Sequence, residues 1–214
     1  MDHSIFRSMT YGVYITTSVD GGRPVGCITN SNTQITSSPA TVSVSVNHDN
    51  YTNACIEKSG MFAYTILSVE SDPSLIGRFG FASSRDTDKF GGLDVEWVEG
   101  VPAVKAGCGY VVCRVIGKME TSTHTVFLGE VVEAKALSPE IAMSYSYYHQ
   151  VIRGKSPKNA PTYIAEEEPK AEGAKKRYQC QICGHIYEGD ALPEDYVCPL
   201  CKHGAQDFKL VSES

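Results

Sequence analysis

Residues 178–187 read YQCQICGHIY, and residues 196–201 read YVCPLC. They place Cys180, Cys183, Cys198 and Cys201 in two Cys-x-x-Cys knuckles separated by fourteen residues. Such a pair supplies four thiolates from two short turns, which is the ligand set of one tetrahedral metal site. Two disulfides are the alternative, but adjacent knuckles in a chain with no recognisable signal peptide favour a metal. The stretch therefore predicts a small domain folded around one metal ion.

The residues around the knuckles help to identify the metal, since four thiolates suit zinc and a single iron equally well. The module is rich in aromatic side chains that can form a small core, namely Tyr178, Tyr187, Tyr196 and Phe208. Residues 177–211 resemble a rubredoxin through Tyr-x-Cys-x-x-Cys-Gly-x-x-Tyr, aromatic-Val-Cys-Pro-Leu-Cys and Asp-x-Phe. Two departures are a shorter loop between the knuckles, as in rubredoxin modules of fused proteins, and Lys202 in place of the usual Gly. The resemblance implies iron, with a zinc ribbon as the alternative.

The whole chain has the composition of a globular protein. Its 214 residues suffice for one substantial domain and a small one, and 42% of them are hydrophobic. A formal net charge of −6 argues against a nucleic-acid partner. No apolar run reaches the length of a membrane span, and the first residues lack the pattern of a signal peptide. We therefore expect a cytoplasmic protein without a membrane partner, in a reducing compartment that keeps its thiols free.

Strand patterns dominate the chain before the knuckles. β-branched and aromatic runs predict strands at residues 11–19, 24–28, 41–46, 61–67, 106–119 and 123–137. Helices are expected at residues 49–59 and 72–81, whereas residues 145–163 show little periodicity. Short turns favour antiparallel pairing, so the expected fold class is mainly β, a barrel with a few helices. The predicted divisions are a larger domain at residues 1–165, a charged linker at 166–177 and the small domain at 178–214.

Polar side chains gather directly after predicted strands and at the start of a predicted helix. They are Asn30, Ser31, Asn32, Thr33, Ser45, Asn47, Thr52, Ser83, Ser84, Arg85 and Lys89. A phosphate group binds to hydroxyls, helix N-termini and positive charge, and an Asn and Ser cluster suits the edge of a flat heterocycle. The chain contains no Walker A sequence and no Gly-x-Gly-x-x-Gly. From physics alone, ordinary polar loops are the favoured interpretation.

Residues 5–165 resemble the flavin reductase-like, FMN-binding split-barrel family, which shifts this balance. The resemblance rests on YGVYITT at 11–17, TNS at 29–31, RFG at 78–80, SRDTDKF at 84–90 and HTVFLGEV at 124–131. It implies a split β-barrel that binds FMN and forms a homodimer, with the flavin near the subunit interface. By position, the isoalloxazine ring or the ribityl chain would face Asn30, Ser31, Asn32, Thr33, Ser45 and Asn47. The phosphate would face Thr52, Ser83, Ser84, Arg85 and Lys89.

Two histidines have no assigned role. The family often has Gly-Asp-His where this chain has Ser122-Thr123-His124, so the orientation of His124 and its contact with a nicotinamide stay open. His149 lies near a basic run that a dinucleotide phosphate could use, formed by Arg153, Lys155 and Lys158. A solvated loop is the more common explanation for each residue of such a run.

An FMN domain fused to a rubredoxin resembles the high-molecular-weight rubredoxins of anaerobic microbes. The resemblance implies that NADH or NADPH reduces FMN and that FMN passes single electrons to the iron. The iron would then reduce another protein, such as a flavodiiron protein that acts on O2 or NO. Nicotinamide gives two electrons as a hydride and the iron takes one, and flavin can do both. On this account no side chain need act as an acid or a base.

Two other functions remain open at this point. A flavin reductase would release reduced flavin to a separate oxygenase, which the attached electron carrier argues against. A zinc-ribbon interaction module on a flavin-binding scaffold would transfer no electrons. Metal content and colour separate these functions, because ferric iron bound by four thiolates is red and zinc is colourless.

Overall fold

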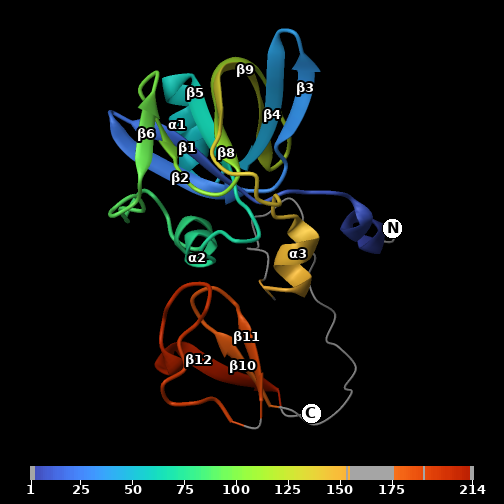
Figure 1. The fold of residues 1–214 in the computed structure, drawn as a ribbon, viewed down its shortest axis with the longest axis vertical. Helices are drawn as coiled ribbons and strands as arrows, with labels where there is room; N and C mark the ends of the chain where they lie inside the picture. Colours follow the sequence, from blue (N-terminus) through green and yellow to red (C-terminus); the bar gives the residue numbers. More distant parts are fainter. Residues whose placement is uncertain (1–2, 153, 155–175, 190, 213–214) are drawn as a thin grey trace.

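A computed structural model describes residues 3–152, 154, 176–189 and 191–212 of the chain (Figure 1). The predicted linker at 166–177 lies outside the described residues, apart from its last two. The larger domain occupies the upper part of the view, and the module that carries the four cysteines lies beneath it, next to helices α2 and α3. None of the helices in the described part of the chain is long and apolar enough to cross a membrane.

The larger domain is built on one antiparallel sheet of seven strands in the order β2-β1-β5-β8-β9-β4-β3. The strands are β1 Tyr14–Asp20, β2 Arg23–Thr29, β3 Thr33–Ser37, β4 Ala40–Asn47, β5 Met61–Ile66, β8 Gly109–Glu120 and β9 His124–Ala136. Tight connections join β1 to β2 and β8 to β9, which gives antiparallel neighbours. The expected mainly β class is confirmed.

The alternation of buried side chains explains how this sheet closes around a core. On β4, Val42, Val44 and Val46 are at most 4% exposed, and they pack against Phe62 of β5 and Phe127 of β9. β-branched residues at every second position favour a pleated strand with one apolar face. The sheet curves, as Figure 1 shows, and strands far apart in its order contribute side chains to one cluster.

Two strand pairs were not anticipated from the sequence. β3 lies in the polar stretch at 29–38, is exposed along its whole length and pairs with β4 only. The hairpin formed by β6 Val95–Val98 and β7 Val101–Val104 packs against β1 and β5, where the Thr65 hydroxyl donates to the Val104 carbonyl at 2.7 Å. Polar or short strands of this kind carry too few apolar residues for their period to be recognised.

Two of the helices pack against the sheet, α1 against β1, β2, β4 and β5, and α2 against β2. α1 spans Tyr51–Ser59 and lies within the predicted helix at 49–59. The Asn50 side chain accepts from the Thr52 N–H at 3.1 Å at its start, and Gly60, with φ of 69°, ends it. α2 spans Ser74–Gly80 and lies within the predicted helix at 72–81. α3, Tyr145–Gln150, was not expected, because six residues are too few to show a helical period. Two short 3-10 helices are η1 His3–Ser8 and η2 Ala205–Asp207.

The small domain is a three-stranded antiparallel sheet beside two cysteine knuckles. Its strands are β10 Lys176–Cys180, β11 Ile186–Gly189 and β12 Phe208–Ser212, in the order β11-β10-β12. The predicted aromatic core is present, with ring centroids of Tyr187 and Tyr196 4.7 Å apart and those of Tyr196 and Phe208 5.3 Å apart. This domain does not stand apart from the larger one, because one buried cluster includes side chains of both.

Candidate functional site

The four cysteine sulfurs of the small domain converge on one point. All four lie within 4.8 Å of one another, with Sγ–Sγ distances of 3.4 Å for Cys183–Cys198 and 3.6 Å for Cys180–Cys201. A disulfide requires about 2.05 Å, whereas tetrahedral ligands at about 2.3 Å from one metal lie about 3.8 Å apart. Three of the cysteines are buried and Cys201 is half-buried. The donor set therefore fits a single ion held by four thiolates and not two disulfides.

The two knuckles have the same backbone hydrogen bonds. The carbonyls of Cys180 and Cys198 accept from the N–H groups of Gly184 and Lys202, at 2.9 and 3.0 Å. Gly184 and Lys202 both have positive φ, of 77° and 61°. Lys202 therefore takes, with a side chain, the left-handed conformation for which rubredoxins usually have Gly, and this departure from the family leaves the turn intact.

Hydrogen bonds around the second knuckle favour the charged form of its first cysteine. The Cys183 thiol, together with the backbone N–H groups of Cys201 and Leu200, lowers the pKa of Cys198. A lowered pKa means that the thiolate, which is the form that binds a metal, is accessible near neutral pH. The hydrogen bond to Cys198 raises the pKa of Cys183, and burial raises the pKa of Cys201, so a metal that binds here must displace the protons of these two thiols.

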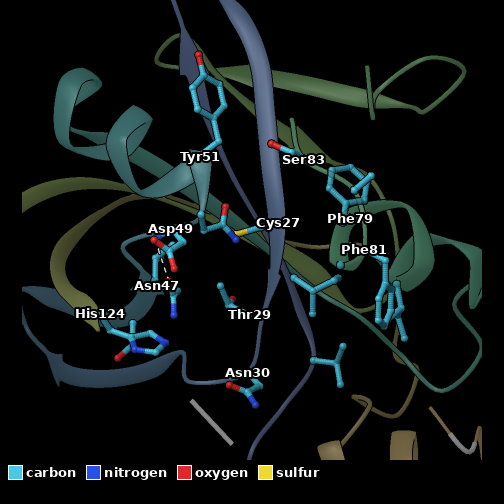
Figure 2. Close-up of a pocket in the computed structure, with 18 of the residues that line it drawn as sticks. Cys27, Thr29, Asn30, Asn47, Asp49, Tyr51, Phe79, Phe81, Ser83 and His124 are labelled. Carbon is cyan, nitrogen blue, oxygen red and sulfur yellow. Dashed lines mark hydrogen bonds between the residues drawn. The ribbon is translucent and has the colours of Figure 1, made fainter. Parts of the chain in front are cut away.

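The larger domain contains a pocket of about 460 Å³, within the usual size of a ligand site. Figure 2 shows that it is elongated, with Asn30 and His124 at one end, Tyr51 and Ser83 at the other, and an apolar wall that includes Phe79 and Phe81. The lining residues come from β2, β4, β9, the N-terminus of α1, α2 with the residues after it, and α3. A long ligand with a flat apolar body and polar ends matches this shape.

The structure brings only part of the predicted flavin set to this pocket. The predicted residues that line it are Asn30, Ser45, Asn47 and Ser83. The pocket lining does not include Ser31, Asn32, Thr33 or Thr52. The Ser31 hydroxyl donates to the Ser45 carbonyl at 3.4 Å, and the Asn32 side chain accepts from the Thr29 hydroxyl at 2.6 Å. Thr33 is exposed at the start of β3, and Thr52 is fully buried in the first turn of α1.

Ser84 and Lys89 line neither this pocket nor the neighbouring cavity, and their side chains hydrogen-bond to the backbone of β2. The Ser84 hydroxyl accepts from the Gly26 N–H at 3.0 Å and donates to its carbonyl at 2.9 Å. The Lys89 ammonium donates to the same carbonyl at 2.9 Å and is 2% exposed. The physical reason is the position of β2 at the edge of the sheet, since its outward backbone groups need partners when they are buried.

Arg85 lies outside the main pocket but close to its Tyr51 end. It lines a neighbouring cavity together with Arg23 and Asp20, and Tyr51 lines both cavities. The guanidinium groups of Arg85 and Arg23 lie 5.2 and 5.7 Å from the centre of the Tyr51 ring. Among the described residues, Arg23 and Arg85 are the arginines that line either cavity, and both lie against the Tyr51 ring beside the N-terminus of α1.

Several lining residues were missed from the sequence. Thr29, Asn50 and Tyr51 adjoin the polar stretches that were recognised, so a wider window would have included them. Tyr145 and Tyr148 come from α3, and no local pattern connects this helix to the pocket. They are identified only by the tertiary structure.

The two histidines are placed differently. His124 lines the pocket opposite Asn47 across the β4–β9 ladder, and its Nδ1 lies 2.8 Å from the Thr123 hydroxyl. Thr123 thus contacts the ring from the position where the family often has Asp. His149 is not among the lining residues, and its Nδ1 lies 2.7 Å from the Gly154 carbonyl. Arg153, Lys155 and Lys158 of the expected basic run lie outside the described residues.

Comparisons with known proteins agree with both parts of this description. Residues 6–156 match the flavin reductase like domain, and residues 178–209 match the rubrerythrin, rubredoxin-like domain. The chain is 37% identical to the high molecular weight rubredoxin of Moorella thermoacetica, covering 99% of this chain and 100% of that protein. It is 36% identical to the ferric-chelate reductase (NAD(P)H) of Archaeoglobus fulgidus, over 77% of this chain and 98% of that one. Among solved structures, an NADH:FAD oxidoreductase of Streptomyces globisporus matches with a TM-score of 0.60 and 25% identity, covering 65% and 84% of the two chains.

The chain therefore belongs to the flavin reductase-like family, with a rubredoxin-like domain attached at its C-terminal side. It is similar along almost its whole length to the high molecular weight rubredoxin of Moorella thermoacetica. Flavin, one iron and a nicotinamide donor are the redox groups that these domains and the NAD(P)H-dependent relatives imply. The chain is an electron-transfer oxidoreductase.

Proposed function

We propose that this chain passes electrons from NADH or NADPH, through FMN in the pocket, to iron at the four cysteines and on to a redox protein. A flavodiiron protein that reduces O2 or NO is the acceptor we propose. The single observation that carries the proposal is the position of Tyr148, which lines the pocket and also packs in the buried cluster that contains Cys183 and Cys198. Because one side chain borders both the pocket and the metal centre, the two lie close enough to favour electron transfer between them.

FMN supplies the exchange between a two-electron donor and a one-electron acceptor, because flavin reacts in both ways. Each NADH provides two electrons, so two successive reductions of the iron, and two of the acceptor centre, balance one NADH. The protein's part is to bind, orient and exclude water.

The pocket offers different chemistry at its two ends. Asn30, Asn47 and His124 would hydrogen-bond the polar edge of the flavin ring, while Phe79 and Phe81 provide an apolar wall. At the other end, Ser83 and the N-terminus of α1, with Arg23 and Arg85 beyond Tyr51, would hold the phosphate. We leave Lys89 and Ser84 out of the phosphate site, because their polar groups are engaged with Gly26.

The four thiolates would hold iron beneath a cover of apolar side chains. Cys180, Cys183 and Cys198 are at most 1% exposed. A buried centre keeps water from the sulfurs and limits the reorganisation that accompanies a change of charge. A reducing cytoplasm suits four thiolate ligands and four further free cysteines. We also propose a homodimer, which the mass in solution by light scattering tests.

An anaerobic titration with NADH, followed by visible absorption, tests the proposal. Reduction of flavin takes two electrons and that of ferric iron takes one, so bleaching of both should need about 1.5 NADH per chain. A zinc-loaded chain would need about one NADH and would show no charge-transfer band. A chain that keeps its ferric band after the flavin has bleached would contradict flavin-to-iron transfer. Release of the reduced flavin, measured by ultrafiltration, would instead favour a flavin reductase that serves a separate oxygenase.

A further inference from the structure

The centre of helix α2 carries a glycine that the helix alone does not explain. Gly77 lies in mid-helix, where Gly is less favourable than Ala by about 0.5–1 kcal/mol. A Cβ on Gly77 would lie 2.6 Å from the Leu200 carbonyl oxygen and 3.0 Å from the Cys201 Cα. Both atoms are backbone atoms of the second cysteine knuckle. The missing side chain therefore lets the metal-binding module approach the helix closely.

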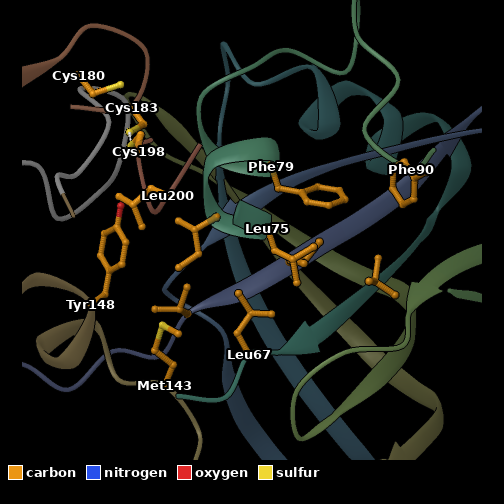
Figure 3. Close-up of a cluster of buried hydrophobic side chains, with 14 of the residues drawn as sticks. Leu67, Leu75, Phe79, Phe90, Met143, Tyr148, Cys180, Cys183, Cys198 and Leu200 are labelled. Atoms are coloured by element: carbon orange, nitrogen blue, oxygen red, sulfur yellow. Dashed lines mark hydrogen bonds between the residues drawn. The ribbon is translucent and has the colours of Figure 1, made fainter. Parts of the chain in front are cut away.

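The apolar tip of that knuckle is buried by the same helix. Leu200, between Cys198 and Cys201, is 0% exposed and belongs to one buried cluster with Leu75 and Ile76 of α2 (Figure 3). At the rim, the Lys202 ammonium lies 3.8 Å from the Asp72 carboxylate, just before α2. That pair is more than half exposed and contributes little energy, but it has the right sign to orient the module.

Tyr148 of α3 connects this contact to the pocket. It is 3% exposed, lines the pocket, and belongs to the same buried cluster as Leu200, Cys183 and Cys198. In Figure 3 its hydroxyl points toward Leu200 and the cysteines. Ile76 of α2 likewise lines the pocket and belongs to the cluster. Side chains from α2 and α3 thus belong both to the lining of the pocket and to the buried cluster that contains the cysteines.

We propose that the module docks on α2 of its own chain through the Gly77 notch, and that this docked state is the one in which the flavin reduces the iron. The docking itself does not depend on the proposed function, whereas the role of the docked state in iron reduction rests on it. In each transfer the reduced flavin loses one electron, Fe(III) becomes Fe(II), and any proton released by the flavin passes to solvent. Undocking then frees the knuckle surface around Leu200 and Lys202 for the acceptor protein.

Gly77→Ala in the full, FMN- and iron-loaded chain tests the docking, with Gly80→Ala as the matched control. Both add one methyl group to α2, at its centre in Gly77→Ala and at its last residue in Gly80→Ala. The nearest atom to a Cβ on Gly80 is a side-chain carbon of Ile28 at 3.5 Å, an ordinary contact. Small-angle scattering should show a larger radius of gyration for Gly77→Ala than for the wild type and for Gly80→Ala. Hydrogen exchange of the α2 amides should rise in Gly77→Ala only.

Stopped-flow measurement of the wild type and Gly77→Ala tests the functional half; Gly80→Ala is left out of this measurement because Gly80 lines the pocket. NADH should bleach the flavin of Gly77→Ala at the wild-type rate, and the iron should then bleach about tenfold more slowly or worse. Leu200→Gln, which places an amide in the apolar contact from the other side, should act in the same direction, provided that its ferric band shows a loaded site. Wild-type iron reduction should not depend on protein concentration, because donor and acceptor belong to one molecule.

The outcomes separate the two halves. Unchanged scattering and unchanged iron reduction in Gly77→Ala would overturn the docking proposal. An expanded variant whose iron is reduced at the wild-type rate would overturn the role of the docked state. If NADH never reduces iron in the wild type, the proposed function fails, while the scattering comparison still decides the docking.

Discussion

Lys89 donates a hydrogen bond from its ammonium group to the Gly26 carbonyl at 2.9 Å, in an environment that leaves it 2% exposed. The same ammonium donates to the Phe79 carbonyl at the end of α2, at 3.0 Å. Lys89, which the sequence analysis places at the flavin phosphate, thus links the edge strand β2 to α2 through hydrogen bonds from the loop that follows α2. The segment that borders the Ser83 end of the pocket is thereby held in place.

Lys89→Met should destabilise the larger domain by about 1–3 kcal/mol, because the Phe79 carbonyl loses its ammonium partner in a buried site. Urea unfolding followed by the fluorescence of Trp97, the single tryptophan, reports on this domain. Lys58→Met is the control, since the Lys58 side chain is 73% exposed, and we expect a change within about 0.5 kcal/mol. Equal effects of the two substitutions would contradict the structural role of Lys89.

The stability difference between the wild type and Lys89→Met should depend on pH. Burial lowers the pKa of Lys89 from its ordinary value of 10.5 to about 8. Between these values the folded chain has released a proton that the unfolded chain still holds, so rising pH stabilises the wild type relative to the variant. The gain should begin near pH 8 and be complete above the unfolded pKa. A difference that is flat from pH 7 to 10.5, or that falls, would rule out this titration.

Arg85→Ala should weaken FMN binding, because Arg85 and Arg23 provide positive charge at the Tyr51 end of the pocket. A charge-assisted hydrogen bond to phosphate contributes about 1.5–3 kcal/mol, so the dissociation constant should rise roughly 10- to 150-fold. Fluorescence titration with FMN measures this change. Arg114→Ala removes the same charge from an exposed position on β8 and should leave the affinity unchanged. Unchanged affinity in Arg85→Ala would remove Arg85 from the phosphate site.

Cys198→Ser should abolish the iron site, since the ion would lose one of its four thiolates. We expect about one iron per wild-type chain from an iron-replete host, and loss of the ferric charge-transfer band in the variant. Cys108→Ser is the control, because Cys108 is half-buried beside the Glu140 carbonyl and lies outside the four-cysteine cluster. Wild-type protein that contains zinc and almost no iron would contradict the electron-transfer proposal.

Local sequence patterns predict most of the strands and helices of the larger domain. The period-2 pattern of Val42, Val44 and Val46, the cap at Asn50 and the positive-φ Gly60 each specify an element from a few neighbouring residues, and the structure contains each of them. β3 and α3 were missed for one physical reason. Their residues carry no amphipathic period of their own, and they take their conformation from β4 and from the buried cluster.

The sequence by itself determined the metal centre, because a knuckle brings its two sulfurs together through local turns and only one further convergence is needed. The polar stretches around Asn30 and Ser83 likewise pointed to a binding site. Only the tertiary structure decided which residues face it. Lys89 turns to the edge of β2, Arg85 joins Arg23 on Tyr51, and Tyr148 reaches the pocket from a distant helix. The positions of these side chains depend on which backbone groups lack partners when the sheet closes, and on contacts between residues far apart in the chain. No local sequence pattern contains this information.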